Sequence, residues 1–187
     1  MKDKILPTIV LTIICTVAAL LLVLAHEATK DSIAEQKELK FSKTVEQLFG
    51  NRSPAGDRSP AGNREIKTLD SNFGCDEIKN IAVTSDGRTA VEIVADGYSK
   101  GGIDVLVGFD ENGAVLGIEF VALGETPGLG SKVRDEEWFR KQFIGAADDS
   151  YSFDAISGAT FSSKGMKRAV DTAIKVYNEN KEAILNG

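Results

Sequence analysis

The chain has 187 residues, and its net charge of −6, from 22 basic and 28 acidic side chains, together with the lack of a basic patch argues against nucleic-acid binding. Its single histidine, His26, cannot build a zinc site, and its two cysteines, Cys15 and Cys75, can neither hold an iron–sulfur cluster nor form an expected disulfide, because Cys15 lies in an apolar run. The sequence also lacks the glycine-rich motifs of nicotinamide and nucleoside-triphosphate sites.

The first predicted element is a single transmembrane helix. Ile5–Ala25 carries no charged residue, and at 1.5 Å per residue it is about 31 Å long, close to the thickness of a bilayer core. Pro7 lies in the first turn, where its missing N–H costs least. A cleaved signal peptide is the alternative, because Lys2 and Lys4 precede the run and Val23–Ala25 could form a cleavage site. The run is longer than a usual signal-peptide core, which favours an uncleaved anchor.

A connecting helix and a loop are predicted to follow. Residues 26–50 are mostly polar, end at a glycine and carry a loose apolar stripe that would pack on a domain. The stripe consists of Ile33, Leu39, Phe41, Val45, Leu48 and Phe49. Residues 51–64 are expected to form a Pro/Gly-rich loop insertion, in which the hexapeptide at Arg52–Asp57 is nearly repeated at Arg58–Asn63. Units this short cannot bury a core, so the duplication does not indicate a repeat architecture.

The remaining residues, 65–187, are enough for one domain and too few for two. Strands are predicted around Val83 and over Ala90–Val94, where apolar and β-branched residues gather. A β-hairpin is predicted from Ile103–Phe109 and Ala114–Ala122, because the intervening D-E-N-G sequence is typical of a tight turn.

Two helices are predicted after the hairpin. The first covers Asp135–Phe143 and places Trp138 on one face with two phenylalanines, so we expect Trp138 to pack in the core. The second runs from about Ser163 to about Leu185, because apolar residues recur at spacings of three and four. These residues are Met166, Val170, Ala173, Ile174 and Tyr177. The order of elements predicts an α+β fold with a mainly antiparallel sheet and flanking helices.

A small-residue turn precedes the second helix, and its sequence from Asp154 is D-A-I-S-G-A-T-F-S-S. Gly158 and Ala159 allow a ligand to approach the backbone, and the first N–H groups of the helix point outward as donors. Thr160 stands before them, so its surroundings suit a phosphate group. The alternative is a plain turn whose serines, Ser162 or Ser163, cap the helix.

The pattern D-x-x-S-G-A-T-x-S resembles the flavinylation motif of the FMN-binding domain family, which includes RnfG- and NqrC-type subunits. The resemblance implies that a separate flavin transferase esterifies the hydroxyl of Thr160 to the phosphate of FMN. Such an ester would leave the isoalloxazine ring unmodified. The other residues that the resemblance places around the cofactor here are Ser157, Gly158, Ala159, Phe161 and Ser162.

A second motif lies upstream, where Gly124–Gly130 reads G-E-T-P-G-L-G and resembles the E-T-P-G-L-G signature of the same family. Its Pro-Gly pair predicts a tight turn with close backbone approach. The resemblance implies that Glu125, Thr126 and Leu129 line the flavin. Tyr98, which precedes the predicted hairpin, could also reach the cofactor face.

The resemblance implies a membrane-anchored flavoprotein subunit of an Rnf-type complex, which couples ferredoxin:NAD oxidoreduction to Na⁺ or H⁺ translocation. Its partners would be the other membrane, iron–sulfur and flavin subunits of that complex. Residues 1–4 would lie in the cytoplasm and the FMN-binding domain outside it, and no independent catalytic site is expected. Two alternatives stay open: an NqrC-like FMN subunit of a Na⁺-translocating NADH:quinone reductase, and a flavin-free anchored interaction domain.

Overall fold

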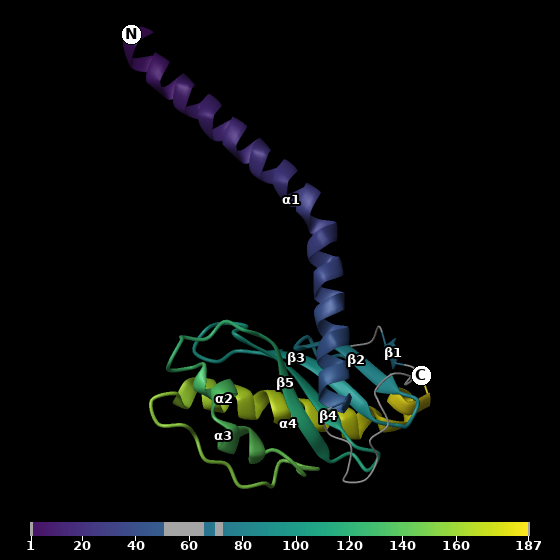
Figure 1. The fold of residues 1–187 in the computed structure, drawn as a ribbon. Helices are drawn as coiled ribbons and strands as arrows, with labels where there is room; N and C mark the ends of the chain where they lie inside the picture. The colour runs from purple at the N-terminus through teal and green to yellow at the C-terminus, as the bar shows by residue number, and fades with distance from the viewer. Residues whose placement is uncertain (1, 51–65, 70–72, 187) are drawn as a thin grey trace. The chain divides into compact units, whose positions relative to one another are not determined.

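The computed structural model describes residues 2–50, 66–69 and 73–186, so the predicted loop insertion at 51–64 lies outside the described residues. The helices are α1 (Lys2–Gly50), α2 (Lys132–Asp135), α3 (Glu137–Lys141) and α4 (Thr160–Asn186). The strands are β1 (Ile66–Leu69), β2 (Ile78–Thr84), β3 (Thr89–Ala95), β4 (Ile103–Phe109) and β5 (Val115–Leu123). The chain divides into two compact units, Met1–Phe41 and Ser42–Gly187 (Figure 1).

The first unit is helical throughout its described residues. Helix α1 runs without a break because neither glycine nor proline occurs between Pro7 and Gly50. Large apolar side chains are exposed along its early turns: Val10, Leu11, Ile13, Ile14, Val17, Leu20, Leu21, Leu22, Val23 and Leu24. By length and composition this helix could cross a membrane, in agreement with the predicted anchor.

The second unit is built on a five-stranded sheet in the order β1-β2-β3-β4-β5, with every neighbouring pair antiparallel. The predicted hairpin is confirmed as β4 and β5. Its turn closes through Asp110, whose Oδ1 accepts the N–H groups of Asn112 and Ala114, both at 2.9 Å. Gly113 adopts φ +93° at the point where the chain reverses. The α+β fold class is confirmed, and the sheet is antiparallel throughout.

Helix α4 covers one face of the sheet, where it contacts β2, β3 and β4 (Figure 1). All five apolar residues that predicted this helix are buried against the sheet. The other face packs on the end of α1, where Val45, Leu48 and Phe49 are buried. A Cβ atom on Gly108 of β4 would lie 2.6 Å from Cδ2 of Leu48, so the glycine makes room for this leucine.

The predicted helix over Asp135–Phe143 is wrong in its continuity. The backbone of Glu136 is extended, with φ −86° and ψ 104°, and divides the segment into α2 and α3. The expectation for Trp138 is also wrong, because its side chain is 48% exposed while Phe139 and Phe143 are fully buried. Helix α3 has five residues, and Phe139 is the one that it buries.

Candidate functional site

The turn that leads into α4 is formed by Ile156–Ala159. Gly158 adopts φ +79°, and the N–H of Ala159 donates to the carbonyl of Ile156 at 3.0 Å. The carbonyl of Ala159 then accepts the N–H of Ser163 at 2.8 Å, so the helix begins at Thr160. Within the described residues, the N–H groups of Thr160 and of the two residues after it make no hydrogen bond. They are the free donors expected at a helix N-terminus.

The predicted serine caps are wrong, because the helix starts two to three residues earlier than the sequence suggested. Ser162 and Ser163 both lie in the first turn and are buried. Oγ of Ser163 accepts the N–H of Ile156 at 3.0 Å, which ties the turn to the helix. The hydroxyl of Ser162 donates to Oε2 of Glu125 instead of capping the backbone.

An open cavity of about 350 Å³ lies at the mouth of α4. Its lining consists of Tyr98, Thr126, Leu129, Gly130, Gly158, Ala159, Thr160, Phe161 and Ser162. The structure therefore brings together residues from both sequence motifs, although Ser157 and Glu125 are outside this lining. Tyr98 and Phe161 are 73% and 71% exposed at its rim, with their ring centroids 6.5 Å apart in an edge-on arrangement.

The Pro-Gly turn of the second motif forms one wall of the cavity and is held by hydrogen bonds within the turn. The N–H groups of Leu129 and Ser131 both donate to the carbonyl of Thr126 at 3.2 Å. Gly128 adopts φ +74°, and its N–H donates to Oγ of Ser131 at 2.9 Å. This turn places Thr126 and Leu129 on the cavity lining, with Leu129 51% exposed.

Glu125 lies behind the cavity wall, where it is only 6% exposed. Its Oε1 accepts the N–H of Ser99 at 3.0 Å, and its Oε2 accepts the N–H of Tyr98 at 3.1 Å. Oε2 also accepts the hydroxyl of Ser162. These partners are 26 to 37 positions away in the sequence, so local patterns could not reveal them. The one feature of the sequence that could have drawn attention to these partners is the glycine-rich G-Y-S-K-G-G segment from Gly97, which contains Tyr98 and Ser99.

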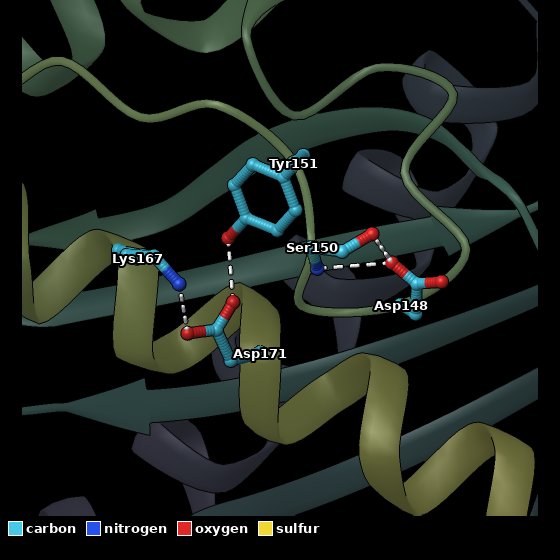
Figure 2. Close-up of polar contacts among 5 residues, drawn as sticks. All are labelled: Asp148, Ser150, Tyr151, Lys167 and Asp171. Carbon is cyan, nitrogen blue, oxygen red and sulfur yellow. Dashed lines mark hydrogen bonds and ion pairs between the residues drawn. The ribbon is translucent and has the colours of Figure 1, made fainter.

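A second polar cluster fixes the segment that leads into the turn before α4 (Figure 2). The hydroxyl of Tyr151 donates to Oδ1 of Asp171 on α4 at 2.6 Å. Lys167 pairs with Oδ2 of the same carboxylate at 2.6 Å and lies 4.8 Å from the centroid of the Tyr151 ring. Burial and the hydrogen bond to Asp171 raise the pKa of Tyr151 far above its ordinary range. Nearby, the carboxylate of Asp148 accepts the N–H of Ser150 at 2.9 Å.

The residues that line the cavity at the start of α4 fit a flavin mononucleotide. The cavity has the size of a small-molecule site and a largely apolar lining, which suits an aromatic ring system. At one end, the exposed Thr160 stands beside the free N–H groups of α4, where a phosphate would meet the positive end of the helix dipole.

Comparisons with known proteins agree with this geometry. Residues 97–175 match the FMN-binding domain family, a span that includes every lining residue of the cavity. A protein of Shewanella amazonensis is 30% identical over 192 residues, which cover 93% of this chain and 86% of the relative. One of Vibrio vulnificus is 30% identical over 187 residues, with 89% and 85% covered. One of Shewanella baltica is 36% identical over 120 residues, with 55% and 56% covered. All three are named as the G component of an ion-translocating oxidoreductase complex.

Proposed function

The chain belongs to the family of RnfG-type components of ion-translocating oxidoreductase complexes, and on that premise we propose that it is the membrane-anchored flavoprotein subunit of an Rnf-type complex. It relays electrons through FMN esterified to Oγ of Thr160. The observation that carries this proposal is the position of Thr160, which lies at once on the cavity lining, at the first residue of α4 and beside free backbone donors.

The attachment is a phosphoryl transfer onto a hydroxyl. The Oγ–H bond of Thr160 breaks, an Oγ–P bond forms and the proton is released to solvent. A flavin transferase supplies the flavin as a phosphoanhydride, and the nucleotide half leaves with the electrons of the broken anhydride bond. The chain therefore gains the mass of FMN less one water.

The residues around Thr160 then hold and orient the group. The free N–H groups of α4 would donate to the phosphodiester, and Gly158 and Ala159 would keep side-chain bulk away from it. Leu129, Tyr98 and Phe161 offer apolar and aromatic surface to the ring. When bound, FMN supplies electron transfer between the other redox centres of the complex.

The anchoring proposal rests on α1. Its exposed apolar turns would lie in the cell membrane as a single pass, with residues 1–4 in the cytoplasm and the second unit on the extracytoplasmic side. Its partners are the other membrane, iron–sulfur and flavin subunits of the complex. The electrons pass between ferredoxin and NAD, coupled to the movement of Na⁺ or H⁺ through those subunits.

The intact mass of the full-length chain tests the attachment. The wild type and the variants Thr160→Ala and Ser152→Ala are each produced with and without a flavin transferase. We expect the added mass of FMN less one water on the wild type and on Ser152→Ala, only with the transferase, and none on Thr160→Ala. Ser152→Ala is the matched control, because it removes an exposed hydroxyl that lies outside the flavinylation motif.

An unmodified wild type in the presence of a transferase that modifies another substrate would refute the proposal. It would leave the flavin-free interaction domain as the better interpretation of the turn. Modification that persists in Thr160→Ala would refute the attachment point alone.

A further inference from the structure

We infer that Glu125 is a positioning residue: its carboxylate assembles the cavity from three chain segments and does not contact the flavin. The inference rests on the proposed function only for its effect on FMN, since the geometry itself needs no cofactor. It differs from the role implied by the family resemblance, in which Glu125 lines the flavin.

The carboxylate of Glu125 lies where three chain segments meet. Glu125 lies at the start of the Pro-Gly turn, and its carboxylate oxygens join that turn to two distant segments. The backbone of Tyr98 and Ser99 belongs to the loop before β4, and Ser162 belongs to the first turn of α4. Each of the three segments contributes residues to the cavity lining, whereas Glu125 does not.

The carboxylate of Glu125 fits closely among three glycines. A Cβ atom on Gly97 would lie 2.7 Å from Oε1 of Glu125, and one on Gly130 would lie 2.7 Å from Oε2. A Cβ atom on Gly102 would also overlap Oε1. Three glycines from two of the segments thus leave space that the carboxylate fills.

The three hydrogen-bond partners of the Glu125 carboxylate are all donors. A glutamine has one acceptor oxygen and a donor amide in place of the second oxygen. Either orientation of that amide faces a backbone N–H, of Tyr98 or of Ser99, and leaves it without an acceptor. An aspartate keeps the charge but is one methylene shorter, so it cannot span the same three donors.

The predicted consequence is specific to the cavity. Without the carboxylate, the loop that carries Tyr98 loses its link to the turn of Thr126 and to the start of α4. The rim around Thr160 would then loosen while the sheet, whose core is formed by other residues, stays folded.

The experiment compares full-length wild type with Glu125→Gln, Glu125→Asp and Ser162→Ala, all produced with a flavin transferase and purified in detergent. Glu137→Gln is the matched control, because Glu137 is exposed and its ion pair is with Lys141, one helical turn away on the same helix. Two readouts are measured. One is hydrogen exchange at the amides of Tyr98 and Ser99, and the other is the fluorescence anisotropy and visible circular dichroism of the attached flavin.

In Glu125→Gln and Glu125→Asp we expect exchange at these two amides to rise by about tenfold or more. We also expect lower flavin anisotropy and weaker visible dichroism, which a role in global stability alone would not change. Ser162→Ala removes one donor, so it should shift the same readouts by less. If Glu125→Gln does not fold, Ser162→Ala and Glu125→Asp carry the test.

Wild-type exchange and wild-type flavin spectra in all three variants would overturn the inference. A wild type that carries no flavin would refute the proposed function instead. Hydrogen exchange would still decide the role of Glu125 in that case, because the amide contacts exist without the cofactor.

Discussion

The end of α1 should stabilise the sheet domain, and Leu48→Ala tests this directly. Leu48 is fully buried, and removing most of its side chain loses about 1.5–3 kcal/mol of apolar transfer free energy. The residue facing it is Gly108, which has no side chain to fill the space left behind. A cavity term therefore adds to the loss, and we expect the free energy of unfolding to fall by about 3–4 kcal/mol.

Leu39→Ala is the matched control on the same helix, because Leu39 is 52% exposed. It should change the free energy of unfolding by no more than about 0.5 kcal/mol. Urea titrations of the full-length chain in detergent can be followed by the fluorescence of Trp138, which is the only tryptophan and lies in the sheet domain. Equal midpoints for the two variants would refute the packing of α1 on the sheet.

Two further substitutions probe the polar contacts. Because Tyr151 has its pKa raised in the fold, its stabilising contribution is complete below its unfolded pKa near 10 and is lost as the pH rises above that value. Tyr151→Phe should lower the free energy of unfolding by about 1–2 kcal/mol at pH 7, because it removes the hydrogen bond to Asp171. In urea titrations at pH 7 to 11, the variant should also lose less stability above pH 10 than the wild type does. The same loss of stability above pH 10 in both proteins would contradict this prediction. Gly130→Ala should lower the free energy of unfolding by about 1–3 kcal/mol, because the new Cβ atom would overlap Glu125. Gly124→Ala is the control: its Cβ atom would lie 3.6 Å from the nearest atom, so the same titration should show a smaller loss. Equal losses would count against the close fit.

The elements that the sequence predicted well are those with strong local periodicity. Apolar spacing predicted α4, and the D-E-N-G turn between apolar runs predicted the hairpin of β4 and β5. The break at Glu136 was not predictable in this way, because no glycine or proline marks it. Trp138 and Phe139 are consecutive residues of α3 and point about 100° apart around its axis, so the helix buries Phe139 and leaves Trp138 exposed.

The candidate site also has one part that the sequence predicted and one part that it did not. Both motifs could be identified from the sequence, and they meet at one cavity. The links of Glu125 to Tyr98, Ser99 and Ser162 span long stretches of chain and depend on how the loops meet in space. A motif in one sequence shows which residue types are present, whereas the side that each one faces is decided by tertiary contacts.

The charges around the cavity support the proposed covalent attachment of FMN. Among the described residues, no lysine or arginine lines the cavity. A phosphate monoester carries about −1.5 to −2 charges at pH 7, and noncovalent sites usually pair such a group with cationic side chains. Here the helix N-terminus offers roughly half a positive charge, and the carboxylate of Glu125 lies behind the wall. In the proposed attachment, esterification to Thr160 would lower the phosphate to a single charge that backbone donors can match, so the bond would replace the ion pairs that the cavity lacks.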